Sequence, residues 1–193
     1  MKIRETDISG LVVIEPDVFG DSRGYFMESF SCRKFRELTG CDIEFVQDNE
    51  SKSSYGVVRG LHFQRPPHSQ SKLVRVVSGR VLDVAVDLRE GSPTYGKHHT
   101  VELSGENHLQ MFIPKGFAHG VAIIEDDTEY TYKVDAPYNG DLGYSGGLSV
   151  FYDPGQLNWD ELLPDTELIL SGKDRTGLSP SPEEADSGIY YEE

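Results

Sequence analysis

Short segments in which hydrophobic and polar side chains alternate follow one another through the first 150 residues, separated by glycine, proline and other turn-forming residues. This two-residue period is that of β-strands, because successive side chains of a strand point to opposite faces of its sheet. The clearest pair of segments is KLVRVV (72–77) and VLDVAVDL (81–88), with a Ser-Gly turn between them. The stretch from residue 55 to residue 88 therefore predicts three strands joined by tight turns.

The other segments predict further strands and few helices. Strands are expected at 11–15, 25–30, 45–49, 98–103, 109–113, 119–123, 128–134 and 147–152. Ser31 is a suitable N-cap and Gly40 a suitable end for a helix over CRKFRELT (32–39), and one helical turn is expected at 158–163. Many short strands at regular spacing, without alternating helices, predict an all-β sandwich or jelly roll with short peripheral helices.

The chain length of 193 residues fits one domain, which we place at residues 1–176. The sequence that follows, GLSPSPEEADSGIYYEE (177–193), is polar and acidic. A segment of this composition has little apolar surface to bury, so we expect a mobile tail unless its tyrosines dock on a neighbouring surface.

The formal net charge of −15 argues against nucleic acid and anionic membrane as partners. The chain has no apolar run long enough to span a membrane, and MKIRETDISG does not have the pattern of a signal peptide, so a cytoplasmic location is expected. A small anionic ligand would need a local basic pocket. The residues available for such a pocket are Arg23, Arg59, Arg65, Lys72 and Arg75.

The most reactive side chains lie in the central stretch, and three of them are Arg59, His62 and Lys72. Strand parity places Lys72 with Val74 and Val76 on an apolar face, where an ammonium group is costly unless an anion meets it or the side chain reaches water. A histidine base, a cation for an enolate oxygen and a tyrosine that returns a proton form the set needed to move a proton beside a carbonyl.

A metal site is the competing interpretation of the histidines. PKGFAH (114–119) matches half of the metal-binding motif of cupin barrels. The other half requires a second histidine two positions after His62, where this chain has Gln64, and Lys72 stands where a ligand carboxylate would be useful. A stable site needs at least three good ligands, so neither a metal nor another cofactor is expected. Stoichiometric iron or manganese in an elemental analysis would favour a metal-dependent oxygenase instead.

Motifs along most of the chain resemble the dTDP-4-dehydrorhamnose 3,5-epimerase family. They are FGDSRGYFMESF (19–30), FVQDNES (45–51), RGLHFQ (59–64), KLVRVVSGRVLDVAVDLREGSPTYG (72–96), IPKGFAHG (113–120) and LSGKD (170–174). The resemblance implies a cupin-type jelly roll, or double-stranded β-helix, without a metal. It also implies a homodimer in which a strand of one chain completes the partner's sheet. The implied substrate is a dTDP-4-keto-6-deoxyhexose, epimerised at C3 and C5 through an enolate.

The same resemblance implies roles for individual residues. The implied catalytic residues are His62 as base, Asp174 as its carboxylate partner, Tyr132 as acid and Lys72 as the cation on the enolate oxygen. Arg23 and Arg59 would hold the diphosphate, because guanidinium geometry suits phosphate oxygens. Residues expected near the nucleotide or the sugar are Phe26, Glu28, Gln47, Asp48, Asn49, His119 and Lys173.

Two features of the sequence leave alternatives open. In a regular strand Arg59 and His62 face opposite sides, so both reach one pocket only if the strand bends or bulges near Gly60. Residues 138–147 depart from the family's pattern. A single-site epimerase acting at C3 or C5 alone, and a sugar-nucleotide-binding protein without turnover, are the alternatives, although Tyr132 favours epimerisation at both carbons.

Overall fold

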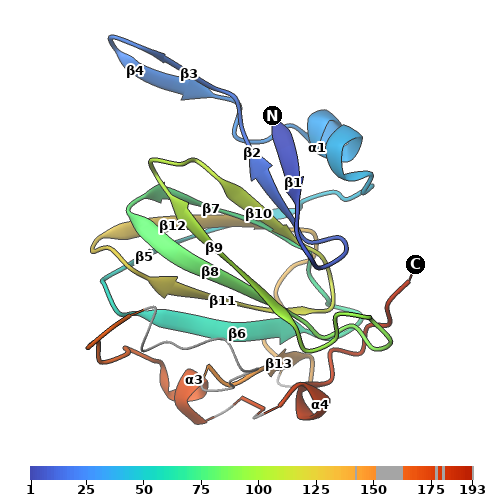
Figure 1. Cartoon of the computed structure of the whole chain (residues 1–193). Coiled ribbons are helices and arrows are strands. Elements are labelled where there is room, and N and C mark those ends of the chain that lie inside the picture. The colour runs from blue at the N-terminus through green and yellow to red at the C-terminus, as the bar shows by residue number, and fades with distance from the viewer. Residues whose placement is uncertain (142, 151–162, 177, 180, 193) are drawn as a thin grey trace.

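Two antiparallel sheets pack face to face in the computed structural model, which describes residues 1–141, 143–150, 163–176, 178–179 and 181–192 (Figure 1). The six-stranded sheet has the order β1 (Lys2–Glu5), β2 (Val12–Glu15), β10 (Gln110–Ile113), β7 (Lys72–Ser78), β12 (Thr128–Val134) and β5 (Gln47–Ser53). The five-stranded sheet has the order β13 (Ser145–Gly147), β6 (Val58–Gln64), β11 (Phe117–Ile123), β8 (Arg80–Asp87) and β9 (His98–Ser104). The predicted all-β jelly roll is confirmed.

The turn between β7 and β8 carries the chain from one sheet to the other, although the two strands are adjacent in sequence. Gly79 makes this turn with a φ of 81°, in the left-handed region that favours glycine. Its Cα also lies against Thr128, because a Cβ added at this position would be 2.8 Å from the Thr128 Cα atom. Gly79 therefore serves both the turn and the close packing of β12.

The space between the sheets holds the central hydrophobic core, which includes Val74, Val76 and Ala85. The outer face of the five-stranded sheet is covered as well, because Val84 and Val86 pack against a C-terminal segment. Figure 1 shows this segment passing beneath the sheet, with α3 (Gly172–Thr176) and α4 (Pro182–Ala185). Strand β8 is thus buried on both faces, whereas its alternating sequence pattern predicts a half-buried strand.

Helix α1 (Cys32–Thr39) covers part of the outer face of the six-stranded sheet and has the bounds expected from the sequence. The hydroxyl of Ser31 accepts a hydrogen bond from the Lys34 backbone amide, and Gly40 ends the helix with a φ of 71°. Phe35 is the helix side chain that enters the core. Among the described residues, no helix is long and apolar enough to cross a membrane.

The structure differs from the sequence-based expectations near both ends of the chain. Strand β1 was not predicted, and the expected loop at 16–24 contains β3 (Val18–Asp21), which pairs with β4 (Gly24–Met27). The strand expected at 147–152 is not found at 148–150, because β13 lies before it and shares only Gly147 with it. Residues 151–152 and most of the expected turn at 158–163 lie outside the described residues. The β3–β4 hairpin extends away from both sheets (Figure 1).

The C-terminal tail packs against the domain. The guanidinium of Arg65 donates to the backbone oxygens of Ala185 and Asp186, and the Ser187 hydroxyl donates to the Leu88 carbonyl at 2.6 Å. The backbone amide of Tyr191 donates to Glu90. The tail was expected to be mobile unless its tyrosines dock on a neighbouring surface, and the Tyr191 ring does dock, with the guanidinium carbon of Arg89 5.0 Å from its centroid. Arg65 and the strand-end carbonyls supply further polar partners that the tail's own sequence does not reveal. The division of the chain at residues 176 and 177 stays a prediction.

Candidate active site

A cavity of about 340 Å³ lies between the two sheets, and residues of both line it. All four predicted catalytic residues are among them, namely His62, Lys72, Tyr132 and Asp174. His62 and Asp174 come from β6 and α3 on one side, whereas Lys72 and Tyr132 come from β7 and β12 on the other. Groups from opposite walls can therefore act on opposite faces of one bound molecule.

His62 and Asp174 form a hydrogen-bonded pair, with 2.6 Å between the His62 Nε2 atom and the Asp174 Oδ1 atom. The other carboxylate oxygen of Asp174 accepts from the Ser171 hydroxyl at 2.8 Å. Burial raises the pKa of Asp174, but the hydrogen bonds from His62 and Ser171 outweigh it and hold this pKa below its ordinary value. An ionised carboxylate only accepts hydrogen bonds, so Nε2 carries the ring proton and Nδ1 keeps the lone pair that a base requires.

A β-bulge in β6 brings Arg59 to the same cavity as His62. His62 pairs with His119 on β11, and Arg59 pairs with Val121, so three steps on β6 are opposed by two on β11. The extra residue on β6 shifts the alternation of side chains by one position. The side chains of Arg59 and His62 therefore point to the same side, and both line the cavity. The bulge lies next to Gly60, where the sequence required a bend.

The ammonium of Lys72 lies inside the cavity, with its Nζ atom 3.5 Å from the Nδ1 atom of His119. Burial lowers the pKa of Lys72 to about 8, and the negative charge of Asp83 opposes this shift. A lysine with this pKa is charged over most of the neutral range, so it can stabilise a developing enolate. The alternative of a lysine extending into water is excluded by its position.

Tyr132 presents its hydroxyl to the cavity without a hydrogen-bond partner among the residues that the structure describes. Burial raises the pKa of this phenol, and Arg59 opposes the shift. The hydroxyl therefore stays protonated at neutral pH and is available to donate a proton. The structure brings Tyr132 together with the other three predicted catalytic residues as the resemblance implied.

The polar residues of β5 divide between the two faces of the six-stranded sheet. Gln47, Asn49 and Ser51 share one face, and of these three Ser51 lines the cavity, whereas Gln47 and Asn49 are absent from its described lining. Glu50, on the other face, borders both this cavity and the one on the outer face. The amide of Gln47 donates to the side-chain oxygen of Asn49 at 2.7 Å. Asp48 has the opposite parity and pairs with Lys133 at 2.8 Å on the outer face. Asp48 therefore does not reach the cavity of its own chain, contrary to its expected position near the substrate.

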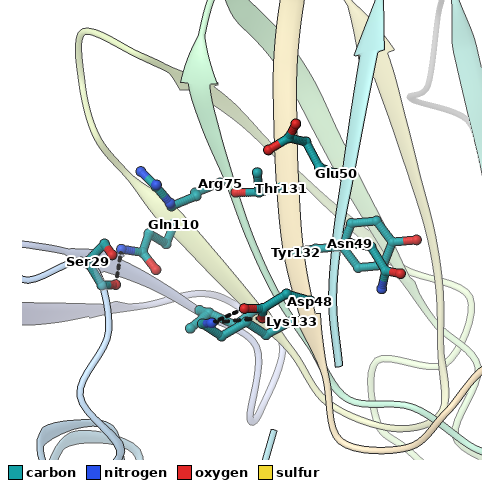
Figure 2. Close-up of a pocket in the computed structure, with 10 residues that line it drawn as sticks. Ser29, Asp48, Asn49, Glu50, Arg75, Gln110, Thr131, Tyr132 and Lys133 are labelled. Carbon is teal, nitrogen blue, oxygen red and sulfur yellow. Dashed lines mark hydrogen bonds and ion pairs between the residues drawn. The ribbon is translucent and has the colours of Figure 1, made fainter. Parts of the chain in front are cut away.

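The outer face beside Asp48 holds a separate cavity of about 370 Å³, which Arg75 and Gln110 help to line. Figure 2 shows Arg75, Gln110 and Lys133 on one side of β12, with Tyr132 and Asn49 projecting to the other. Of the five residues of the predicted basic pocket, Arg59 and Lys72 line the cavity, whereas Arg23, Arg65 and Arg75 are absent from its described lining. Arg75 has the opposite strand parity to Lys72, and Arg65 holds the C-terminal segment.

The substrate-binding residues predicted on the β3–β4 hairpin and just after it do not reach the cavity of their own chain. Arg23 forms an ion pair with Asp21 at 2.6 Å, and Glu28 forms one with Lys34 at 2.8 Å. The side chain of Phe26 is 70% exposed. Lys173 is exposed on α3 next to Asp174 and is absent from the cavity lining among the described residues. Their roles in binding stay predictions.

Residues that the sequence reasoning missed complete the site. Ser171 holds Asp174, and Ser51 follows from the parity of Gln47 and Asn49 on β5. Tyr130 is buried and also lines the cavity, and Asp83 lies behind it, bonded to both His119 and Tyr130. The sequence could have indicated a role for Asp83, because a carboxylate in an otherwise apolar strand that is buried on both faces needs a polar partner.

The chemistry of the site does not favour a metal. Gln64, at the position of a second cupin histidine, binds the backbone of Asn139 and the Ser145 hydroxyl. Of the two ring nitrogens of His119, Nδ1 faces the Lys72 ammonium and Nε2 is bonded to Asp83. Among the described residues, no group of three His, Cys, Asp or Glu side chains is placed to hold an ion.

A histidine–carboxylate pair, an ammonium and a tyrosine that face one cavity between two sheets define a cupin-like enzyme of acid–base chemistry. The sequence model of the family described as dTDP-4-dehydrorhamnose 3,5-epimerase matches residues 5–180. The dTDP-4-dehydrorhamnose 3,5-epimerase of Escherichia coli strain K12 is 48% identical over 175 residues, which are 90% of this chain and 91% of that protein. The chain belongs to the dTDP-4-dehydrorhamnose 3,5-epimerase family and is an isomerase.

Solved structures agree with this assignment. The dTDP-4-dehydrorhamnose 3,5-epimerase of Elizabethkingia anophelis NUHP1 has a TM-score of 0.87 at 45% identity, over 96% of this chain and 98% of that one. The dTDP-6-deoxy-D-glucose-3,5-epimerase of Legionella pneumophila Philadelphia 1, solved in complex with dTDP-4-keto-L-rhamnose, has a TM-score of 0.78 at 38% identity, over 100% of this chain and 99% of that one.

Proposed function

We propose that this enzyme epimerises dTDP-4-dehydro-6-deoxy-D-glucose at C3 and C5 and so produces dTDP-4-dehydro-L-rhamnose. The observation that carries the proposal is the His62–Asp174 pair, which faces Lys72 and Tyr132 across one cavity. The ligand in the Legionella structure, dTDP-4-keto-L-rhamnose, is the expected product. Both carbons flank the C4 ketone, so one set of residues can serve each in turn.

His62 is the base that removes the proton from C3 or C5. The C–H electron pair becomes the new C=C bond, and the π electrons of the ketone move to its oxygen. The Lys72 ammonium stabilises this enolate oxygen. Asp174 keeps the imidazole in the tautomer with an unprotonated Nδ1 and stabilises the imidazolium that forms.

Tyr132 returns a proton to the opposite face of the same carbon and thereby inverts it. It can do so because it lies on the wall across from His62. The proton held by His62 and the proton lost by Tyr132 then exchange with water, which restores both residues for the second carbon. No atom is gained or lost in the substrate, as an isomerisation requires.

A homodimer is part of this proposal. The β3–β4 hairpin exposes Phe19 and Phe26 by 65% and 70%, and Arg23 lies at its tip. Strand β5 is an edge of the six-stranded sheet beside the cavity, and no described strand pairs with its outer side. A hairpin from a second copy, pairing at this edge, would carry Arg23, Phe26 and the nearby Glu28 to the mouth of the cavity. There Arg23 and Arg59 would hold the diphosphate.

Solvent deuterium incorporation, followed at each carbon of dTDP-4-keto-6-deoxyglucose, tests the proposal. The parent enzyme is expected to label C3 and C5, and His62→Ala is expected to fold normally and to label neither. A label at one carbon alone would identify a single-site epimerase. Calorimetric binding of dTDP without any label would identify a binding protein, and exchange by His62→Ala at the parent rate would overturn the assignment of the base.

A further inference from the structure

Along one wall of the cavity, four side chains form a continuous hydrogen-bonded row that begins at Lys72 and ends at Tyr130, and all of them except Asp83 line the cavity. Lys72 Nζ lies 3.5 Å from His119 Nδ1, and His119 Nε2 lies 2.9 Å from Asp83 Oδ1. The Tyr130 hydroxyl donates to the other oxygen of Asp83 at 2.5 Å. Asp83 is fully buried and does not line the cavity. The proposed mechanism uses only the first member of this row.

The donors and acceptors of the row determine the tautomer of His119. Burial raises the pKa of Tyr130 well above its ordinary value, so this phenol donates to Asp83. The carboxylate of Asp83 can only accept, so it also takes the hydrogen of His119 Nε2. Burial lowers the pKa of His119, so its ring is neutral and Nδ1 has a lone pair. The one hydrogen-bonding atom of the ring on the Lys72 side is therefore an acceptor.

This row of side chains supports the charge of Lys72 without placing an anion in the cavity. Lys72 needs a nearby negative charge to keep its proton in a buried position. A carboxylate in direct contact would form an ion pair and place an anion beside the enolate and the diphosphate, where it would repel both. A neutral imidazole between Asp83 and Lys72 keeps the negative charge out of the cavity and still orients the ammonium.

We propose that Asp83 is a positioning residue for this reaction: held by Tyr130, it fixes His119 so that Nδ1 receives and orients the Lys72 ammonium toward the enolate oxygen. The inference rests on the proposed function, since the reaction supplies the enolate. Asp83 acts through His119 and Lys72 and does not touch the substrate. Its removal should lower kcat more than it raises KM.

The decisive variant is Asp83→Asn, which keeps the shape of the side chain and removes its charge. We expect kcat to fall about 10- to 100-fold, as for other partners that orient catalytic groups, and KM to change by less than about twofold. The alkaline decline of kcat/KM should move to lower pH by about one unit, because Lys72 loses the charge that supports its protonated form. Other titratable groups that line the cavity are Glu50, Arg59, His62, His119, Tyr130, Tyr132 and Asp174, and none of them is replaced in this variant.

The matched control is Asp87→Asn on the same strand. Asp87 is also fully buried, but it binds Arg89, Ser92 and Thr94 away from the cavity. Its replacement should destabilise the fold and leave the alkaline decline in place. If folded Asp83→Asn and Asp87→Asn show the same pH profile as the parent, the inference is wrong while the proposed function stands, since the parent's exchange at C3 and C5 tests that separately.

A second pair of variants decides the question if Asp83→Asn does not fold. The amide of His119→Gln can donate to Asp83 and accept from Lys72, whereas His119→Leu can do neither. His119→Gln should keep about ten times the activity of His119→Leu, a difference expected from one charged hydrogen bond. Equal activity of the two variants would overturn the inference.

Discussion

Tyr130 and Tyr132 lie on the same face of β12 with ring centroids 6.1 Å apart, yet their hydroxyls have different surroundings. The Tyr130 hydroxyl is held by Asp83 at 2.5 Å, whereas the Tyr132 hydroxyl has no hydrogen-bond partner within the described part of the chain. A hydroxyl already bound in the core cannot deliver its proton to a substrate. The structure therefore distinguishes two tyrosines that are equivalent in strand parity and supports Tyr132 as the acid.

Tyr132→Phe should separate proton removal from inversion. The variant keeps the ring and its packing but has no proton to return, so turnover to the epimer should fall by about 10²- to 10⁴-fold. His62 can still remove a proton and return a deuteron to the same face, so substrate recovered from deuterium oxide should carry label without inversion. Nuclear magnetic resonance of the recovered sugar measures both. The control is Tyr190→Phe, which alters an exposed tyrosine of the C-terminal tail and should not affect inversion. Full inversion by Tyr132→Phe would contradict the assignment of Tyr132 as the acid.

Asp174→Asn should reduce kcat with little change in KM. The amide matches the carboxylate in shape, but it can donate to His62 Nε2 and no longer stabilises the imidazolium, so a loss of about 10²- to 10⁴-fold is expected. The control is Asp127→Asn, which alters an exposed aspartate paired with Lys52. Steady-state kinetics and the midpoint of thermal unfolding should be measured together. Parent-like kcat in a folded Asp174→Asn would remove this residue from the mechanism.

The activity of the parent enzyme should decline as the pH rises through about 8. Burial lowers the pKa of Lys72 to about 8, and only its charged form, present below that pH, can stabilise the enolate. Lys72→Arg keeps its charge above pH 12, so its remaining activity should lack this decline. The activity of Lys72→Met should be lower than that of the parent enzyme at every pH, by about 10²-fold or more. A flat parent profile from pH 7 to 10, or the same decline in Lys72→Arg, would contradict the role of Lys72.

Phe26→Glu should weaken both self-association and substrate binding. The side chain of Phe26 is 70% exposed on the β3–β4 hairpin, and a charge there opposes burial against a second copy. Light scattering should show a shift toward the monomer, and KM should rise with it. Tyr190→Glu, which alters another exposed aromatic residue, should change neither. An unchanged dimer with unchanged KM would show that the hairpin does not complete the partner's site.

Gly79→Ala should destabilise the fold more than Gly91→Ala. Both glycines have a φ of 81°, so alanine at either position costs about 1 kcal/mol of backbone strain. A Cβ at Gly91 meets no atom within 4 Å, whereas a Cβ at Gly79 would clash with the Thr128 backbone and side chain. Overpacking adds about 1–3 kcal/mol, which urea unfolding can resolve. Equal losses would show that the crossing between the sheets tolerates the added methyl group.

Much of this enzyme follows from sequence alone. Alternating side chains determine the strands, and capping by Ser31 and Gly40 determines α1, because these signals are local. The strand parity of β7 already separates Lys72 from Arg75. The resemblance to a known family pointed to His62, Lys72, Tyr132 and Asp174, which the cavity brings together.

Tertiary structure decided the rest, because it depends on contacts between distant segments. The bulge that turns Arg59 toward His62 follows from the pairing of β6 with β11, and the docking of the tail follows from Arg65, 120 positions away from Ala185. The row from Lys72 to Tyr130 spans both sheets. Strand parity determines which face of its own sheet a side chain occupies, but only the packing of one sheet on the other determines which charges meet across the space between them.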